Sequence, residues 1–471
     1  MRLAELAGIG GDSRVTGFAI DHRKVAPGTV FGAFRGSVFN GEDFIPSAVS
    51  AGAVAVVARP GVAVEGAQHV AAEEPRREFA RLAAKFFKPF PEAVVAVTGT
   101  NGKTSSVELT RQLWRMAGHH AASIGTLGVT TADDRTVTGL TTPDIVTFLS
   151  NMAGLAREGV THAAFEASSH GLSQYRTEGL PVRAGAFTNF SRDHLDYHQT
   201  MQAYFEAKMR LFDEVVEPDG AAVVWTDDAK SDEVIARART RGLRLLTVGR
   251  RGEALKLVER EPTQLGQRLF VEAQGKRYKI ELPLIGAYQA ANALTAAGLA
   301  LATGGALEQT LTSLGRVQGV RGRLERAVIT RAGAPVYVDY AHTPDAIEAA
   351  VEALRPHAKG RLIIVFGAGG DRDVGKRAQM GAVATRLADR VIVTDDNPRS
   401  EDPAAIRRDV LEGAPGALEV PGRREAIAAA VAEAGADDII LLAGKGHEQG
   451  QVVGDKVLPF DDVTVARECA A

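Results

Sequence analysis

The sequence AVVAVTGTNGKTSSVELTRQLWRMA occupies residues 93–117. It begins with an apolar run, passes through a loop rich in glycine and threonine, and continues as a helix-like stretch from Ser105 to Ala117. A strand, a glycine loop and a helix in this order are typical of a phosphate-binding site, because the loop N–H groups and the helix N-terminus face the anion. The segment therefore predicts an α/β fold with a nucleotide site after this strand.

The loop contains the side chains that such a site requires. Gly99 and Gly102 allow the backbone to approach phosphate oxygens, Lys103 supplies a positive charge, and the hydroxyl group of Thr104 suits Mg²⁺. The common phosphate loop has another glycine five residues before the second one, where this chain has Val97. We therefore expect nucleotide binding by a shortened form of the loop.

The composition limits the classes of function. The chain has 471 residues, which suggests about three domains of roughly 150 residues each. A net charge of −3 gives no basic field for nucleic acid or a membrane surface, and the single cysteine, Cys469, excludes an internal disulfide framework. The N-terminus lacks the pattern of a signal peptide and no apolar run is long enough to span a membrane, so we expect a cytoplasmic protein.

Three α/β domains are predicted along the chain. Residues 1–90 form a small domain with strands at 16–25, 29–34 and 53–58 and a helix at 44–52; prolines at 88–92 mark a linker. Residues 91–320 form a central P-loop ATPase-type parallel-sheet domain, with strands at 162–168, 184–190 and 221–226, a β excursion at 253–283 and a helix at 287–303. Residues 321–471 alternate apolar strands with helices, which predicts a Rossmann-like, doubly wound sheet.

The polar residues of the third segment gather in the loops that follow its strands. These loops read DYAHTPD (339–345), GAGGDRD (367–373), DDNPR (395–399) and GKGHE (444–448). Ligands of parallel sheets bind beyond the carboxyl ends of the strands, so we expect one site along this edge. GAGGDRD resembles a dinucleotide fingerprint, but Arg372 occupies the third glycine position and disfavours NAD.

A dozen blocks in the same order resemble the Mur ligase family, and within it the branch that joins meso-diaminopimelate to UDP-N-acetylmuramoyl-L-alanyl-D-glutamate. The blocks are DHRKVAPG (21–28), TGTNGKT (98–104), TTPD (141–144), EASSHGL (166–172), TNFSRDHLDYH (188–198), YFEAKMRLF (204–212), GAYQAAN (286–292), GVRGRLE (319–325), DYAHTPDA (339–346), GAGGDRDVGKR (367–377), DDNPRSEDP (395–403) and GKGHE (444–448). The resemblance implies a monomeric, ATP-dependent amide ligase that works through an acyl phosphate. It also implies that the first domain binds UDP-sugar and the last binds the amino acid.

A magnesium site is expected beside the phosphate loop. Glu166 ends one predicted strand and His194 follows another, and an oxygen-rich site with few histidines suits Mg²⁺. The resemblance implies that Glu166, His194 and Thr104 hold the metal. It also implies that Lys208 is carbamylated, whereas the helical pattern around Lys208 by itself favours a solvent-exposed lysine.

The resemblance assigns binding residues for two substrates. It also implies catalytic roles for Lys103, Lys208, His194 and Glu166. The ATP-binding residues are Gly99, Thr100, Asn101, Gly102, Lys103, Thr104, Asn292, Arg323 and Asp339. The UDP-muramoyl-dipeptide is assigned to Ile20, His22, Thr141, Thr142, Ser168, Gln174 and Arg176, with His22 at the uridine end where the family usually has serine.

The resemblance also implies a diaminopimelate pocket. Its residues are Arg372, Asp396, Asn397, Pro398, Arg399, Gly444 and Glu448. Meso-diaminopimelate carries a distal carboxylate that lysine lacks, and a guanidinium group such as that of Arg399 binds a carboxylate through two parallel hydrogen bonds. Pro398 stiffens the turn directly before Arg399 and so helps to orient that side chain. The carboxylate of Glu448 suits the distal ammonium group.

Other functions remain open from the sequence. A Mur ligase that adds L-lysine, another diamino acid or D-alanyl-D-alanine shares most of these blocks. A folylpolyglutamate synthase shares the loop and the chemistry but would lack the domain at residues 1–90 and the DNPR block. A non-catalytic muropeptide-binding or ATP-sensing module is disfavoured, because the chain has Lys103, Glu166 and His194 together.

Overall fold

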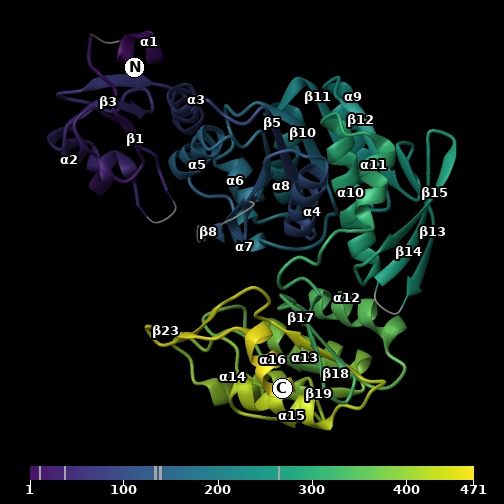
Figure 1. Cartoon of the computed structure of the whole chain (residues 1–471). Coiled ribbons are helices and arrows are strands. Elements are labelled where there is room, and N and C mark those ends of the chain that lie inside the picture. Colours follow the sequence, from purple (N-terminus) through teal and green to yellow (C-terminus); the bar gives the residue numbers. More distant parts are fainter. Residues whose placement is uncertain (10–11, 37–38, 132–134, 137–140, 264–265) are drawn as a thin grey trace. The chain divides into compact units, whose positions relative to one another are not determined.

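The computed structural model describes residues 1–9, 12–36, 39–131, 135–136, 141–263 and 266–471. The chain divides into two compact units (Figure 1). The first comprises Met1–Lys256 and Asn292–Leu311, and the second comprises Leu257–Ala291 and Thr312–Ala471.

The first unit begins with a parallel sheet in the order β1-β2-β3-β4. Its strands are β1 (Gly17–Ala19), β2 (Thr29–Gly32), β3 (Ala53–Ala58) and β4 (Gln68–Ala71), with helices α1 (Leu3–Ala7), α2 (Ile45–Ser50) and α3 (Pro75–Phe87). The predicted strand at 16–25 is too long. The carboxylate of Asp21 accepts a hydrogen bond from the N–H of Arg23 at 3.0 Å and starts the 3-10 turn η1 (His22–Lys24), which ends the extended backbone.

The first unit also contains the strands β12-β11-β10-β5-β9-β6-β7-β8 of a larger sheet, in this order, and the first residues of β13 beside β12. Its strands are β5 (Ala93–Thr98), β6 (Ala121–Gly125), β7 (Gly128–Thr130), β8 (Arg135–Thr136), β9 (His162–Glu166), β10 (Val182–Phe187), β11 (Val216–Trp225), β12 (Arg244–Gly249) and β13 (Leu255–Thr263). All neighbouring pairs from β13 to β6 are parallel. The central strands are apolar and buried on both faces, which is the pattern of a parallel sheet covered by helices.

The helices of the central region are α4 (Lys103–Met116), α5 (Ile145–Arg157), α6 (Ser169–Ser173), α7 (Leu195–His198), α8 (Met201–Arg210), α9 (Ser231–Thr240), α10 (Ala287–Ala302) and α11 (Leu307–Leu314). A π-helical turn, η3 (Leu211–Val215), follows α8. The predicted strands at 162–168 and 184–190 end earlier, at Glu166 and Phe187. Because β10, β5 and β9 are neighbours in the sheet, the loops after these three strands meet at one edge.

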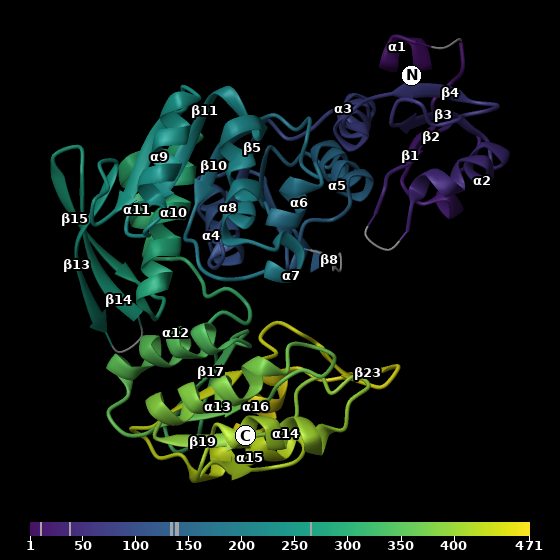
Figure 2. The same ribbon diagram turned by 180° about the vertical axis from the view of Figure 1, so that it is seen from behind.

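The second unit, whose residues from Thr312 on are drawn in green to yellow in Figure 2, contains a six-stranded sheet in the order β16-β17-β21-β18-β19-β20. Its strands are β16 (Glu325–Ile329), β17 (Pro335–Asp339), β18 (Leu362–Phe366), β19 (Arg390–Val393), β20 (Leu418–Glu419) and β21 (Ile439–Ala443), and only the β16–β17 pair is antiparallel. Helices α12 (Pro344–Leu354), α13 (Gly375–Leu387) and α14 (Pro403–Glu412) share one apolar core with this sheet, whereas α15 (Arg423–Glu433) and α16 (Asp462–Ala470) share another.

Alternate residues of each strand enter these two cores. In β18, Ile364 and Phe366 lie in the first core, and Ile363 and Val365 lie in the second. This arrangement confirms the predicted doubly wound sheet. Two hairpins complete the second unit: β14 (Gly266–Ala273) with β15 (Lys276–Leu282), and β22 (Gly450–Val453) with β23 (Lys456–Pro459).

Within the part of the chain that the structure describes, no helix is both long enough and apolar enough to cross a membrane.

Candidate functional site

The phosphate loop follows β5 and leads directly into α4, as its sequence predicts. Gly99 and Gly102 have φ angles of 145° and 82°, which favour glycine. A Cβ atom on Gly99 would overlap the hydroxyl group of Thr188, and one on Gly102 would overlap the side-chain amide of Asn292. Asn292, which was predicted near ATP, therefore lies against this loop.

Residues after β10 hold the loop in shape. The N–H of Asn101 donates to Oδ1 of Asn189 at 2.8 Å, and the Thr188 hydroxyl donates to the carbonyl of Asn101 at 2.6 Å. The N–H of Thr100 donates to the carbonyl of Asn189 at 2.9 Å. These contacts fix the backbone that would bind the nucleotide phosphates.

Two lysine side chains converge on one carbonyl group of this loop. Nζ of Lys103 lies 2.9 Å from the carbonyl oxygen of Gly99 and 2.7 Å from that of Thr100. Nζ of Lys208 lies 2.7 Å from the same Gly99 oxygen and 4.3 Å from the ring centre of Tyr204. Lys208 is only 1% exposed, so the expectation of a solvent-exposed lysine from the helical pattern alone is wrong. Burial, reinforced by the charge of Lys103, holds the pKa of Lys208 well below its usual value.

The predicted magnesium ligands differ in their surroundings. Glu166 is 2% exposed, and its carboxylate accepts hydrogen bonds from the N–H of Thr126 at 2.7 Å and from its hydroxyl group at 3.3 Å. Thr104 is buried at the start of α4. His194 is half-exposed, has a φ angle of 51°, and its Nε2 lies 3.4 Å from Oδ2 of Asp193.

These residues fit Mg²⁺ better than a metal ion whose ligands must all come from protein side chains. Among the described residues, no three His, Cys, Asp or Glu side chains gather in a way that could hold a metal ion. Mg²⁺ keeps several waters and is bound through one or two carboxylates together with substrate phosphates. The buried carboxylate of Glu166 and the hydroxyl group of Thr104 at the phosphate loop meet that requirement.

The residues predicted for the muramoyl-dipeptide form one hydrogen-bonded group. The hydroxyl of Thr142 lies 2.9 Å from Oγ of Ser168 and donates to the carbonyl of Glu166 at 2.8 Å. Arg176 donates to the carbonyl of Thr142 at 2.7 Å and to Oε1 of Gln174 at 2.8 Å. The Thr141 hydroxyl lies 3.1 Å from that of Thr126, which also contacts Glu166. The structure thus brings these five residues together beside Glu166.

The two residues predicted for the uridine end lie after β1. Ile20 is 38% exposed. The imidazole ring of His22 stacks on Phe44, with ring centres 4.4 Å apart and planes inclined by 2°. This stack gives the position of the usual serine a flat aromatic surface.

Asp339 and Arg323 belong to the second unit. Asp339 is buried at the end of β17, and its Oδ2 accepts a hydrogen bond from the N–H of Leu324 at 2.7 Å. Burial raises the pKa of Asp339 to about 6, although the charge of Arg323 acts in the opposite direction. The Arg323 guanidinium lies 4.9 Å from the ring centre of Tyr340.

Most residues predicted for diaminopimelate lie in loops that follow β19 and β21. Asn397 donates from Nδ2 to Oε2 of Glu448 at 2.8 Å. Nη1 of Arg399 donates to the carbonyl of Gly370 at 2.7 Å. Gly444 has a φ angle of 113°, and a Cβ atom there would lie 2.6 Å from Oδ2 of Asp396. Arg372, in the neighbouring loop after β18, is exposed.

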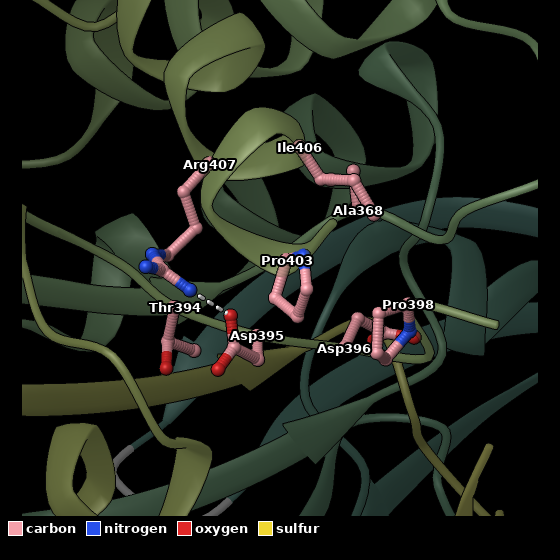
Figure 3. A pocket seen from close by; sticks show the side chains of 8 residues that line it. All are labelled: Ala368, Thr394, Asp395, Asp396, Pro398, Pro403, Ile406 and Arg407. Carbon is pink, nitrogen blue, oxygen red and sulfur yellow. Dashed lines mark hydrogen bonds and ion pairs between the residues drawn. The ribbon is translucent and has the colours of Figure 1, made fainter. Parts of the chain in front are cut away.

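The loop after β19 also borders a small pocket (Figure 3). Asp396 and Pro398 line it together with Ala368 from the loop after β18. Arg407 of α14 forms an ion pair with Asp395 beside them. This pair ties α14 to the loop that carries the predicted diaminopimelate residues.

Several residues of the site were not assigned a role from the sequence. Thr188, Asn189 and Tyr204 support the phosphate loop, and His170 places its ring 4.9 Å from that of His194. All four lie within the blocks quoted above, so the blocks contained the signal but their spacing did not reveal the contacts. Thr126 lies outside every block and carried no sequence signal.

Family models match nearly the whole chain. Residues 14–100 match the Mur ligase family catalytic domain, residues 97–300 the Mur ligase middle domain, and residues 322–446 the glutamate ligase domain of Mur ligases. A UDP-N-acetylmuramoyl-L-alanyl-D-glutamate–2,6-diaminopimelate ligase of Zymomonas mobilis is 61% identical over 97% of this chain and 95% of its own length. The ligase of the same name from Bradyrhizobium diazoefficiens is 53% identical over 95% and 93%.

Solved structures give the same picture. A structure of a UDP-N-acetylmuramoyl-L-alanyl-D-glutamate–2,6-diaminopimelate ligase is similar over 100% of this chain and 98% of its own, with a TM-score of 0.76 and 32% identity. A folylpolyglutamate synthase of Mycobacterium tuberculosis complexed with ADP has a TM-score of 0.63 and 21% identity, over 79% of this chain and 91% of its own. At 21% identity, the similarity to the folylpolyglutamate synthase indicates a shared fold and does not indicate a shared function.

Proposed function

The chain belongs to the Mur ligase family, and we propose that it joins meso-diaminopimelate to UDP-N-acetylmuramoyl-L-alanyl-D-glutamate while ATP is converted to ADP and phosphate. The relatives that carry this activity in their names are 46–61% identical to it along almost its whole length. The reaction is a step of peptidoglycan precursor synthesis. We place it in the cytoplasm and propose that the enzyme acts as a monomer.

The chemistry requires activation of a carboxylate. At neutral pH a carboxylate does not react with an amine, because its leaving group would be oxide. The γ-phosphoryl group of ATP is therefore transferred to the D-glutamate carboxylate, which gives an acyl phosphate and ADP. The amine of diaminopimelate then attacks the carbonyl carbon, inorganic phosphate leaves, and the amine loses a proton.

We assign the first step to the phosphate loop. Phosphoryl transfer depends mainly on positioning and on neutralising the charge of the phosphate oxygens. The N–H groups of residues 99–104 and the ammonium group of Lys103 are suited to that role. Glu166, Thr104 and His194 would hold Mg²⁺, which supplies further charge neutralisation when it is bound.

We assign the acceptor substrate to the group around Thr142. Arg176 and Gln174 suit its carboxylate and diphosphate groups, and Thr141, Thr142 and Ser168 place hydroxyl groups beside Glu166. His22 and Ile20 would contact the uridine end. Asn292, Arg323 and Asp339 are proposed as further ATP-binding residues.

The choice of amino acid rests on Arg399. Its backbone is held in a left-handed conformation, with a φ angle of 53°, by hydrogen bonds to Val452 at 3.0 Å and from Gly454 at 2.7 Å. The guanidinium uses Nη1 for the carbonyl of Gly370, and among the described residues no carboxylate forms an ion pair with it. A half-buried guanidinium in this state is suited to the distal carboxylate of diaminopimelate.

The test compares kcat/KM for meso-diaminopimelate and L-lysine by phosphate release. We expect the wild-type enzyme to prefer diaminopimelate by about 10³-fold or more, because a site built around a polar group rejects an analogue that lacks its partner. Arg399→Ala should reduce the preference to about tenfold or less. The control is Arg386→Ala on α13, which removes an exposed ion pair with Glu348. It should leave kcat/KM for both amino acids unchanged.

Equal use of both amino acids by the wild-type enzyme would overturn the substrate assignment. Failure of the wild-type enzyme to release phosphate with any amino acid in the presence of ATP and the UDP-dipeptide would overturn the proposed ligase reaction itself.

A further inference from the structure

Lys445 is a completely buried cation in the loop after β21, with 0% of its surface exposed. Its Nζ atom donates to Oδ1 of Asn397 at 3.1 Å, to Oε2 of Glu448 at 3.1 Å and to the carbonyl of Gly450 at 2.6 Å. An ammonium group has three N–H donors, so all three have an acceptor within the protein. Lys445 therefore has no donor left for a substrate.

The three acceptors lie on three different segments. Asn397 lies in the loop after β19, Glu448 in the loop after β21, and Gly450 begins the hairpin strand β22. The hairpin strand is in turn bound to the β19 loop: the N–H of Val452 donates to Oδ1 of Asn397 at 3.0 Å, and the side chain of Gln451 donates to the carbonyl of Asp396 at 2.6 Å. One buried ammonium group thus connects three segments, among them the one that carries the proposed ammonium-binding carboxylate.

The hydrogen bonds also orient the carboxylate of Glu448. Its Oε2 accepts from both Lys445 and Nδ2 of Asn397, at 3.1 and 2.8 Å. Its Oε1 receives no hydrogen bond from any residue in the described ranges. A carboxylate oriented through one oxygen presents the other to a ligand, and Glu448 is only half-buried, so this oxygen is available to an incoming cation.

We infer that Lys445 is a positioning residue for amino-acid recognition: it holds Glu448 and Asn397 in the orientation that binds the distal ammonium group of the incoming diamino acid. The inference rests on the proposed function, because it takes Glu448 as the partner of that ammonium group. Lys445 acts through these two side chains and does not touch the amino acid.

The first test measures Michaelis constants for Lys445→Met, which keeps the length of the side chain and removes its donors. We expect KM for diaminopimelate to rise at least tenfold, while KM for ATP and for the UDP-dipeptide stay within twofold of wild type. Arg361→Met is the control. It removes an ion pair between Arg361 and Asp438, which directly precede β18 and β21 and so lie at the other edge of the sheet from the loop that carries Lys445. It should affect thermal stability without changing any of the three constants.

A double-mutant cycle with Glu448→Gln separates positioning from general support of the fold. Interacting residues give non-additive effects, whereas independent ones add in free energy and so multiply in KM. We expect the double variant to bind diaminopimelate about as weakly as the weaker single variant. Multiplied effects would overturn the inference.

Two further outcomes are distinguishable. If Lys445→Met does not unfold cooperatively, Lys445→Arg is measured in the same way, because it keeps the charge and misplaces the donors. A KM for diaminopimelate within threefold of wild type in the folded variant would overturn the inference. If the wild-type enzyme itself does not use diaminopimelate, the proposed function fails instead.

Discussion

Lys208 is a buried lysine whose surroundings disfavour its charged form. Among the described residues it has no carboxylate within ion-pair distance, and the neighbouring cation Lys103 shares its carbonyl acceptor on Gly99. Burial and this like charge hold its pKa well below the usual value, so a neutral amine is populated at a lower pH than for an exposed lysine. A neutral amine is the form that adds to carbon dioxide, giving a carbamate and a proton.

We predict that Lys208 is carbamylated in the active enzyme. Removing dissolved carbon dioxide should lower activity and bicarbonate should restore it. Lys208→Ala should lose roughly 10²-fold or more in kcat and recover part of it with added formate or acetate, because a small carboxylate can replace the carbamate group. Lys279→Ala, an exposed lysine paired with Glu281, is the control. Unmodified Lys208 in a high-resolution map of the active enzyme would contradict the prediction.

The sequence predicted the residue types of the site better than their environments. Lys208 belongs to an amphipathic pattern with Tyr204, Leu211 and Phe212, and a pattern of this kind does not state which polar positions face solvent. The burial of Lys208 depends on the phosphate loop, more than 100 positions earlier in the chain. The same limit applies to Lys445, which lies in a quoted block but gained a role only from contacts with Asn397 and Gly450.

At the scale of elements, alternation of apolar runs with helical patterns predicted most strands and the doubly wound sheet. Strand β3 (Ala53–Ala58) has the predicted bounds, because its residues are apolar and buried. Strand β1 is shorter than predicted, since the side chain of Asp21 competes for a backbone N–H and starts a turn. The β22–β23 hairpin was not predicted, because its residues Lys456–Pro459 are exposed and lack a core-facing pattern.

The junction of β5 and α4 allows a prediction at this scale. Alanine at Gly102 would adopt a left-handed conformation at a cost of about 1–2 kcal/mol, and its Cβ would also displace the side-chain amide of Asn292. We expect Gly102→Ala to lower kcat/KM for ATP by about 10²-fold through distortion of the phosphate loop. KM for diaminopimelate should stay within twofold.

The opposite end of α4 offers a matched control. Gly118 has a φ angle of 92°, close to that of Gly102, but a Cβ atom there would meet nothing within 4 Å. Gly118→Ala therefore imposes a similar backbone cost without the clash. It should lower the thermal transition and leave the kinetics with ATP unchanged. Equal effects of the two substitutions on kcat/KM for ATP would show that distortion of the phosphate loop is not the cause of the loss of activity.

At the scale of the whole molecule, the order of the blocks along the chain carried the family assignment. Single blocks were ambiguous: a strand, GTNGKT and a helix are equally consistent with a folylpolyglutamate synthase. The match of residues 14–100 to a Mur ligase model and the identity of 61% to a named relative decide between these families. The predicted domain boundaries at residues 90 and 320, and the monomeric state, stay predictions.

The acyl phosphate gives a prediction for the complete reaction. Its carbonyl carbon is reactive toward any strong nucleophile, so hydroxylamine should intercept it when diaminopimelate is left out. We expect a hydroxamate of the UDP-dipeptide to form with one ADP and one phosphate released per molecule, measured by mass spectrometry and coupled phosphate assay. Lys103→Ala should abolish hydroxamate formation while its thermal transition stays near that of the wild type, because Nζ of Lys103 hydrogen-bonds to the loop carbonyl groups of Gly99 and Thr100, at 2.9 and 2.7 Å. Arg399→Ala, in contrast, should form hydroxamate at the wild-type rate, since it is assigned to the amino acid and not to phosphoryl transfer. Amide synthesis without any trapping by hydroxylamine, even at concentrations that leave the enzyme active, would argue against a free acyl phosphate on the pathway.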